Sequence, residues 1–443
     1  MEKEKANEFG RKTWRPVKFE DLVPGRKRNR IIGMTFPRTN LSLALEPSIL
    51  TVLPPGKNVE FDMFTRDYND DDVELYLCSV YITGMDEFVA WALRHDKSKI
   101  VVGGYHPTAF SEEFVRYAGR IVQGPCDDIW ATLAQEGQIV RGIVSNKTLP
   151  RRDLYDVAKN YQVIPDKMLA DIAVSINTSM GCNMDPPCDF CCTPLMCEKQ
   201  TSRPLEMVVR EAESLRVYDP EYLFIRDENF TTQKDWRARL EAIHRILPET
   251  KIYLFASANT LSEATVSFMA GHGVYMVCLG LEDPTVEYGK NKKLDSAIAR
   301  LKRYGIMTYL SFIVDPLKII GREDGENFYN LLMARLYELG PEMICGNFLM
   351  PFRGTKIWDE YYAFVSPEDY KDYDTKTPFL VRNPIVREKM KFFLFWYQWL
   401  YYTSDFYNNE VRKFAVGDTL HLRFQELYEQ FMPQYERMWD ERP

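Results

Sequence analysis

Residues 173–192 have the sequence AVSINTSMGCNMDPPCDFCC, in which an apolar run is followed at once by closely spaced cysteines. The run AVSINTS (173–179) is typical of a buried strand, and the first cysteine, Cys182, lies three residues beyond it. In β/α barrels, active sites lie on the loops at the carboxyl ends of the strands. The stretch therefore predicts an α/β fold with a metal or redox site on a strand-end loop.

The strand pattern of residues 173–179 recurs five more times towards the C-terminus. Helix-sized intervals separate the runs, and in two of them, at 204–218 and 327–340, apolar residues recur every three or four positions. Six such units predict an incomplete TIM-type barrel over residues 173–360, instead of the full eight. The further predicted strands are YLFIRD (222–227), KIYLFAS (251–257), YMVCLGLE (275–282), MTYLSFIVD (307–315) and EMICGNFLM (342–350).

A second series of short apolar runs precedes the barrel. Runs of this kind at helix-sized intervals indicate a parallel sheet covered on both faces, which predicts a Rossmann-like domain over residues 29–140. An N-terminal extension (1–28) precedes it, and a polar, proline-containing linker (141–172) follows a candidate helix at 127–137. The predicted strands are IIGMTF (31–36), VEFDMF (59–64), VELYLCSVYI (73–82), KIVVGG (99–104) and RIVQG (120–124).

The loops at the ends of these strands would form a ligand crevice. They comprise PRTNLS after the first strand, Thr83-Gly84 after the third, Gly103-Gly104-Tyr105-His106-Pro107 after the fourth and Gly124-Pro125-Cys126-Asp127 after the fifth. The alternative is that these glycines only make tight turns. His106 is the one histidine in a predicted crevice loop, and a hydrogen-bonded structural role competes with ligand contact there.

Residues 361–443 are rich in aromatic side chains and have helical patterns, clearest at 389–407 and 419–439. Tyrosine and tryptophan combine a large apolar surface with a polar group. Three roles are open for this region: closing the open side of the barrel, lining a substrate pocket, or packing as ordinary helices.

The composition limits the class of protein. At 443 residues with 45% hydrophobic side chains, the chain is long enough for two or three domains. Its net charge of −8 argues against non-specific binding to nucleic acids or anionic membranes. The N-terminal residues MEKEKANEFGRKTW lack the apolar run of a secretory signal, and the longest apolar run (392–402) is too short to span a bilayer. We therefore expect a cytoplasmic protein with no membrane partner.

Nine cysteines, an odd number in a chain expected to be cytoplasmic, favour metal or redox use over a disulfide scaffold. Five lie within 16 residues, at Cys182, Cys188, Cys191, Cys192 and Cys197, whereas Cys78, Cys126, Cys278 and Cys345 are isolated and are predicted to be small core residues. A [4Fe–4S] cluster needs four ligands, so three thiolates would leave one iron open to a small molecule. Zinc is the alternative, because Cys188 and Cys191 have zinc-knuckle spacing, but no matching second pair follows at the usual distance.

The cysteine loop resembles the signature of the radical S-adenosylmethionine (SAM) superfamily, with Cys182, Cys188 and Cys191 as cluster ligands and Phe190 as the aromatic residue before the last cysteine. Five residues separate Cys182 from Cys188 where the usual signature has three, so Cys192 or Cys197 stays open as a substitute ligand. The resemblance implies that SAM binds the open iron through its amino and carboxylate groups. One electron, from a donor such as flavodoxin or ferredoxin, then cleaves it to a 5′-deoxyadenosyl radical.

Other segments resemble the cobalamin-binding subgroup of that superfamily. Residues 97–127 are similar to the fourth and fifth strands of its Rossmann domain, and Pro351-Phe352-Arg353-Gly354-Thr355 is similar to its Pro-Gly-Thr turn. The Asp-x-His-x-x-Gly motif that ligates cobalt is absent, because residues 37–48 contain no histidine. The resemblance implies SAM contacts at Asp227, Glu228, Asn229, Ser257, Gly280 and Glu282, and possible cobalamin contacts at Gly103, Gly104, His106 and Gly124.

The resemblance implies a radical SAM enzyme, with cobalamin-assisted methylation of an unactivated carbon as the favoured reaction. A cobalamin-independent isomerase or cyclase acting on a small metabolite or a modified nucleobase is the alternative. A third hypothesis, a non-enzymatic metal-binding adaptor, predicts degraded SAM-contact segments, whereas DENF (227–230) and LGLED (279–283) are intact. The sequence identifies neither the substrate nor a residue that acts on it.

Overall fold

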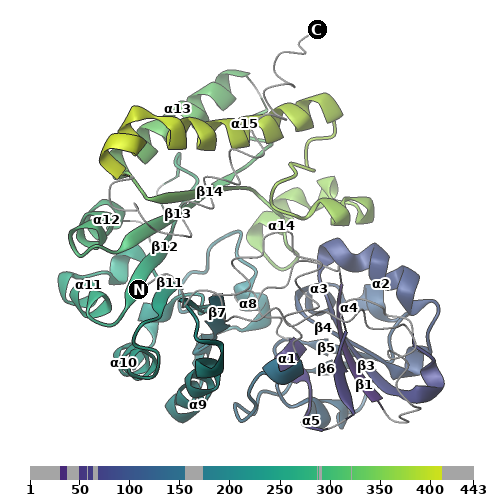
Figure 1. Ribbon diagram of the computed structural model, residues 1–443. Coiled ribbons are helices and arrows are strands. Elements are labelled where there is room, and N and C mark those ends of the chain that lie inside the picture. Colours follow the sequence, from purple (N-terminus) through teal and green to yellow (C-terminus); the bar gives the residue numbers. More distant parts are fainter. Residues whose placement is uncertain are drawn as a thin grey trace, which may run out of the picture.

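The computed structural model describes residues 30–36, 49–56, 58–62, 68–154, 173–286, 288, 292–320 and 322–411. In this part of the chain, two six-stranded parallel sheets, each with its own helices, stand side by side (Figure 1). The N-terminal extension, the PRTNLS loop, most of the predicted linker and the helix predicted at 419–439 lie outside the described residues. Among the described residues, none of the helices combines the length and the apolar character needed to cross a membrane.

The N-terminal sheet has the strand order β2-β1-β3-β4-β5-β6, and every pair is parallel. The order changes direction between β1 and β3, as in doubly wound sheets, which bind ligands at the carboxyl ends of the strands beside this point. The Rossmann-like prediction is therefore confirmed. The strands are β1 (Arg30–Phe36), β2 (Val59–Phe61), β3 (Val73–Val80), β4 (Ile100–Gly103), β5 (Arg120–Gln123) and β6 (Ile139–Arg141).

The sequence missed β6, because this edge strand has only three residues, two of them exposed, and so lacks the apolar run that marked the other five. Its sheet is covered by short helices. On α2, Phe88 and Trp91 are buried against Phe36 of β1, with ring centroids 5.4 and 5.5 Å apart. The helices are α1 (Ile49–Val52), α2 (Met85–Ala92), α3 (Tyr105–Ala109), α4 (Ser111–Phe114) and α5 (Ile129–Leu133).

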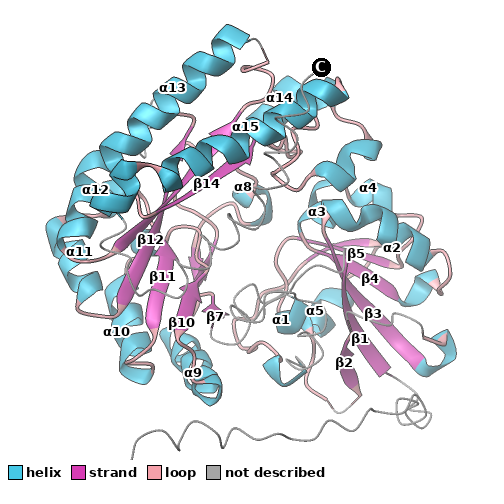
Figure 2. Ribbon diagram, turned by 45° about the horizontal axis from the view of Figure 1, so that its top comes forward, coloured by secondary structure: helices cyan, strands magenta, loops and turns pink. Residues whose placement is uncertain are grey.

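The second sheet has the order β7-β10-β11-β12-β13-β14, again parallel throughout, and confirms the six-stranded partial barrel. Its strands are β7 (Ala173–Ile176), β10 (Tyr222–Ile225), β11 (Lys251–Phe255), β12 (Val274–Glu282), β13 (Met307–Val314) and β14 (Met343–Phe348). Between them lie α9 (Leu205–Leu215), α10 (Trp236–Ile246), α11 (Glu263–Ala270), α12 (Leu294–Arg303) and α13 (Arg322–Leu339), which line the outside of the sheet (Figure 2).

The two faces of the barrel sheet differ in their surroundings. Residues such as Leu254, Val277 and Leu310 point outwards and are buried in the large core that the helices share. The alternate residues point inwards, and at the bottom of the barrel Tyr222, Met276, Met307 and Met343 form a separate small core. The inward face is therefore packed at its bottom layer.

The C-terminal residues cover the open edge of the barrel sheet. This region contains α14 (Lys356–Tyr361) and α15 (Pro384–Thr403). Along β14, the Ile344 amide donates to Tyr402 Oη (2.7 Å) and the Gly346 amide donates to Gln398 Oε1 (3.0 Å). Because no described strand lies on the other side of β14, these buried groups would otherwise lack partners. The aromatic helix α15 is thus the cap of an edge strand.

We predict that Tyr402→Phe lowers the free energy of unfolding by about 1–3 kcal/mol, because the buried Ile344 amide loses its acceptor. Urea denaturation followed by circular dichroism measures the change. Tyr362→Phe is the matched control, since Tyr362 is 61% exposed, and should alter stability by less than about 0.5 kcal/mol. Equal stability of wild type and Tyr402→Phe would show that the Tyr402 hydroxyl does not stabilise the edge strand β14.

Candidate functional site

The cysteine loop follows the first barrel strand, as predicted. Cys182, Cys188 and Cys191 are half-buried in the segment between β8 (Ser179–Met180) and α8 (Thr193–Met196). The strand β9 (Thr201–Ser202) returns antiparallel to β8 and closes the loop at its base. All nine cysteines lie in the described part of the chain as thiols, and none is in a disulfide.

The cysteines of the loop follow one another closely in sequence, but their side chains are not grouped around one point. The Cys191 amide donates to the Cys188 carbonyl (2.9 Å), which makes a tight turn between two of the predicted ligands. Within the described residues, no three His, Cys, Asp or Glu side chains are grouped so that they could hold a metal ion. The ligand set Cys182, Cys188 and Cys191 therefore stays a prediction.

A buried carboxylate holds the base of this loop. Asp227, at the end of β10, accepts hydrogen bonds from the Thr178 amide (2.6 Å), the Ser179 hydroxyl (2.8 Å) and the Gln233 side chain (2.6 Å). The Thr178 hydroxyl donates as well (2.5 Å). Burial raises the pKa of Asp227, and the hydrogen bonds oppose that shift. Asp227, predicted to contact SAM, is thus fully engaged in fixing the loop.

Asn229 also connects strand ends. Its side-chain Oδ1 accepts from the Ser257 amide at the end of β11 (3.1 Å), and its carbonyl accepts from Gln200 beside β9 (2.9 Å). Both Asn229 and Ser257 are buried. These two predicted SAM contacts therefore lie together, with their hydrogen-bonding groups at the carboxyl ends of adjacent strands.

Gly280 and Glu282 lie together at the carboxyl end of β12. The pairing of β12 with β13 shifts between these two residues, which is a bulge, and Glu282 is buried with φ at +62°. Bulges of this kind redirect side chains at the ends of strands. The predicted SAM contacts thus lie in a row at the carboxyl ends of β10, β11 and β12.

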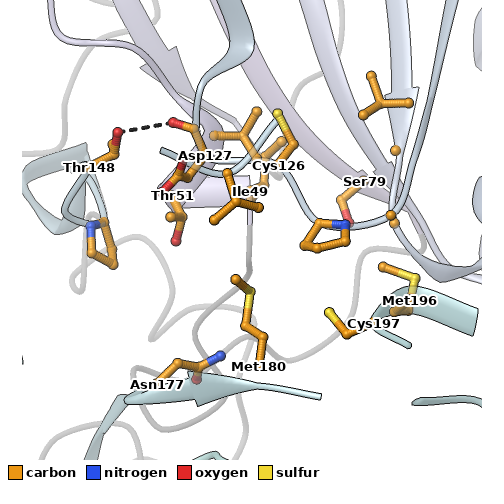
Figure 3. A pocket seen from close by; sticks show the side chains of 18 of the residues that line it. Ile49, Thr51, Ser79, Cys126, Asp127, Thr148, Asn177, Met180, Met196 and Cys197 are labelled. Carbon is orange, nitrogen blue, oxygen red and sulfur yellow. Dashed lines mark hydrogen bonds between the residues drawn. The ribbon is translucent and has the colours of Figure 1, made fainter. Parts of the chain in front are cut away.

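A cavity of about 430 Å³ lies between the two domains. Figure 3 shows Ser79, Cys126 and Asp127 of the N-terminal domain on one side and Met180 and Cys197 of the barrel on the other. Glu228 also lines it, whereas Asp227 and Asn229 do not. The cavity thus lies where the carboxyl ends of β3, β4 and β5 face the cysteine loop.

Glycines form part of the N-terminal wall of this cavity. Gly103, Gly104 and Gly124, all predicted ligand contacts, line it. Gly104 and Gly124 have φ of +105° and +78°, which disfavours other residues, and a Cβ on Gly104 would lie 3.4 Å from Ser79 Oγ. The backbone therefore comes directly to the cavity surface, as it does where a bulky ligand approaches a sheet.

The structure shows the surroundings of two residues of this region, His106 and Cys126. His106 does not line the cavity: α3 turns its buried ring towards Phe110 and Tyr370, with ring centroids 5.1 Å away in both cases, and Nε2 lies 3.2 Å from Glu113. Cys126, predicted to be a small core residue, is half-buried: it packs against the main core and also lines the cavity. Its thiol lies 3.3 Å from the Thr132 hydroxyl.

The barrel side of the cavity carries weakly acidic groups. Glu228 is accessible from the cavity, yet desolvation raises its pKa, and the charge of Arg226 opposes the shift. Burial raises the pKa of Cys192 to about 11, although the Tyr105 hydroxyl of the N-terminal domain hydrogen-bonds to it. The contact between Tyr105 and Cys192 joins the two walls of the cavity.

Aromatic contacts also join the domains beside the cavity. Phe110 of the N-terminal domain packs edge-on against Trp358 of α14, with centroids 5.4 Å apart, and Tyr105 packs similarly on Phe352 (5.1 Å). Arg353 pairs with Glu112 and lies 5.3 Å from the Phe110 ring centre. The Pro-Phe-Arg-Gly-Thr turn is therefore part of the domain contact.

The sequence missed a buried charge network at the β7 edge. Glu211 of α9 pairs with Arg203 (2.5 Å) and with Arg152 of the linker (2.7 Å). Arg152 also donates to the Ser175 carbonyl (2.8 Å), and Arg203 to the Asn177 carbonyl (2.6 Å). The sequence did not predict this network because Arg152, Arg203 and Glu211 are single charged residues that form no recognisable motif.

We predict that Asp227→Ala loosens the cysteine loop, because four donors lose their acceptor. Iodoacetamide labelling of the apoprotein, followed by mass spectrometry, should show faster alkylation at Cys182. The buried Cys278 serves as the internal reference, and Glu213→Ala, at an exposed position on α9, is the control variant. Unchanged labelling at Cys182 would contradict the role given to Asp227.

Comparisons with known proteins agree with this architecture. No family model matches the sequence. Two curated proteins of Chlorobaculum tepidum are similar to it. Bacteriochlorophyllide d C-8(2)-methyltransferase is 23% identical over 368 residues, which cover 74% of this chain and 78% of the relative. Bacteriochlorophyllide d C-12(1)-methyltransferase is 22% identical over 306 residues, 62% of each chain.

Solved structures of one enzyme, the radical SAM methyltransferase TsrM from Kitasatospora setae, superpose over most of the chain. The form with cobalamin and a [4Fe–4S] cluster bound has a TM-score of 0.55 at 16% identity and covers 75% of this chain and 78% of TsrM. The form with tryptophan and the SAM analogue aza-SAM has a TM-score of 0.54, also at 16% identity, and covers 76% of each chain. The chain thus has the fold of the cobalamin-binding type of radical SAM enzyme, as its sequence resemblance predicted.

Proposed function

We propose that this chain is a radical SAM methyltransferase, with a [4Fe–4S] cluster on Cys182, Cys188 and Cys191 and cobalamin in the cavity between the domains. The observation that carries the proposal is the cavity itself. One wall is the glycine-lined crevice of a nucleotide-type sheet, and the other is the loop that bears the cysteines. A cobalamin in the cavity and a cluster on this loop would therefore be neighbours.

The positions of the cysteines support this ligand set. Cys192 and Cys197 line the cavity, whereas Cys182, Cys188 and Cys191 do not. A cluster held by the latter three would lie behind the cavity wall and leave the cavity to a second group. We assign Cys192 and Cys197 to the wall.

The residues present fit cobalamin without a protein imidazole. Among the described residues that line the cavity there is no histidine, and the sequence between β1 and α1 contains none. The glycines after β4 and β5 leave room at the strand ends. Bound together, the cluster would supply the electron that cleaves SAM, and cobalamin would act as the methyl carrier.

The chain's own residues would orient the reactants and exclude water. Asp227 and Asn229 fix the strand ends on which the predicted SAM contacts lie. Contacts through Phe110 and Tyr105 hold the two domains together beside the cavity, and shielding of that space from water would suit reactive intermediates. The reaction needs an external one-electron donor, of flavodoxin or ferredoxin type, and nine thiols suit a reducing cytoplasm.

Methylation of an unactivated carbon is the reaction that we favour over an isomerase or cyclase. The support is that the curated relatives and TsrM are all named as methyltransferases. The alternative is a cobalamin-independent isomerase or cyclase, so bound cobalamin separates the two proposals.

We predict that alanine at Cys182, Cys188 or Cys191 abolishes both the brown cluster absorbance and SAM cleavage after anaerobic reconstitution. Cys192→Ala and Cys197→Ala are the matched controls, because they remove thiols of the same segment that line the cavity. They should keep the iron content and the SAM cleavage of the wild type. Loss of the cluster in either control would show that the ligand set is different.

We predict that the reconstituted protein retains one equivalent of hydroxocobalamin after desalting, measured by its visible spectrum. Gly124→Val should reduce retention at least tenfold, since the side chain enters the crevice at φ +78°. Gly305→Val, at a glycine with similar φ and open surroundings, controls for backbone strain. The reduced cofactor should show no imidazole-nitrogen splitting in its electron paramagnetic resonance spectrum. A wild-type protein that retains no corrin would refute the methyltransferase proposal and leave the isomerase.

A further inference from the structure

The upper part of the barrel's inward face is open, unlike its packed bottom layer. On β13 and β14, buried residues alternate with partly exposed ones, and the exposed set points inwards. It includes Ser311, Cys345 and Asn347. In a closed TIM barrel, such positions are filled by interdigitated side chains. Their exposure marks a surface that can receive a ligand.

One side of this surface is aromatic. Phe224 and Tyr253 stack in parallel across β10 and β11, with centroids 4.4 Å apart and planes 5° apart. Phe255, two residues beyond Tyr253 on the same face, meets Phe224 edge-on at 5.3 Å and is 37% exposed. An exposed phenylalanine at the mouth of a barrel gains free energy when an apolar or aromatic group covers it.

The opposite side of the surface carries hydrogen-bond donors. Lys376 Nζ lies 2.6 Å from the Gly346 carbonyl, 3.0 Å from Asn347 Oδ1 and 3.4 Å from Cys345 Sγ. All three are neutral, and in the described part of the chain Lys376 has no carboxylate partner. Arg226, the cation at the other end of the face, has the Glu228 charge beside it. Lys376 is therefore a half-buried positive charge without a counter-ion.

Neutral donors accompany this charge. The Asn347 amide nitrogen has only the distant Cys345 sulfur as acceptor, at 3.7 Å. Ser311 pairs in register with Cys345, and its hydroxyl has no partner among the described residues. The Ser311 hydroxyl and the Asn347 amide lie on the neighbouring strands β13 and β14, and the Lys376 ammonium reaches β14 from a loop; together these donors match the acceptor oxygens of a carboxylate.

The separation of the two sides indicates the form of the ligand. Three strand spacings, about 14 Å, separate β11 from β14, and the inward side chains shorten that gap. We propose that this face binds a planar aromatic acid, with its ring on Phe255 and its carboxylate at Lys376, Asn347 and Ser311. The proposal rests on the proposed function, for which it names the substrate class.

Substitutions at Lys376 can separate ligand binding from a structural role in which Lys376 only caps the edge strand β14 by donating to the Gly346 carbonyl. Lys376→Gln keeps a donor for the Gly346 carbonyl but removes the charge, whereas Lys376→Arg keeps the charge. If the residue only caps the strand, both variants should bind ligands as the wild type does. Lys371→Gln, at an exposed lysine nearby, is the matched control.

The test uses the full-length, reconstituted protein and two probes of equal size, 2-naphthoate and neutral 2-naphthalenemethanol, with affinities from isothermal titration calorimetry. We expect naphthoate to bind about tenfold more tightly than the alcohol. This preference should disappear in Lys376→Gln and persist in Lys376→Arg. Phe255→Ala should weaken both probes about tenfold, and Phe364→Ala, at an exposed phenylalanine outside the face, should weaken neither.

Absence of naphthoate binding, a preference that survives Lys376→Gln, or unchanged affinity in Phe255→Ala would each overturn the inference. Binding is measured without turnover, so these results leave the proposed function intact. Failure of the proposed function appears separately, in the cluster and cobalamin experiments.

Discussion

The organisation of the candidate site depends on the buried carboxylate of Asp227. Two strands of a parallel sheet end beside each other with unpaired amides, and burying such groups costs free energy unless they find acceptors. Asp227 supplies the acceptor for the amide and hydroxyl of Thr178 and for the Ser179 hydroxyl. The chain that enters the cysteine loop therefore starts from one fixed position. Without Asp227, the fold would not fix where the cysteine loop begins, and the loop carries five cysteines that could serve as ligands.

The same requirement governs both edges of the barrel. An incomplete barrel leaves β7 and β14 with unpaired backbone groups, which a closed barrel avoids. Tyr402 and Gln398 satisfy β14, whereas Arg152 and Arg203, held by Glu211, satisfy the carbonyls at and beyond β7. Arg152 belongs to the linker that follows the N-terminal domain. Its contacts with Glu211 and the Ser175 carbonyl therefore also attach that linker to the β7 edge of the barrel. Arg152, Arg203 and Glu211 also line the cavity between the domains.

Repeated apolar runs allowed the strands to be predicted from the sequence, whereas contacts between side chains far apart in sequence could not be predicted. Eleven strands were predicted from apolar runs, because a parallel sheet covered on both faces buries whole runs. The three-residue β6 has no such run. For the site, spacing placed the cysteine loop and the glycines of the crevice, but could not distinguish Glu228, which reaches the cavity, from its neighbour Asp227, which is buried. His106 shows the same limit, since α3 turns it towards Tyr370, more than 250 residues away in sequence.

The cavity and the inward face of the barrel meet at the carboxyl ends of β7 and β10. Ser175 and Asn177 on the β7 side, and Arg226 after β10, line the cavity and also point to the inward face in the strand register. A ligand on the aromatic side at Phe224 would thus lie one strand from the cavity, since β10 is next to β7. A carboxylate fixed at the far side, on β14, would orient the ring end of the substrate towards the cavity and its cofactors. In this arrangement, the aromatic side chains on β10 and β11 and the ammonium group of Lys376 would together determine which carbon of the ligand faces the cavity.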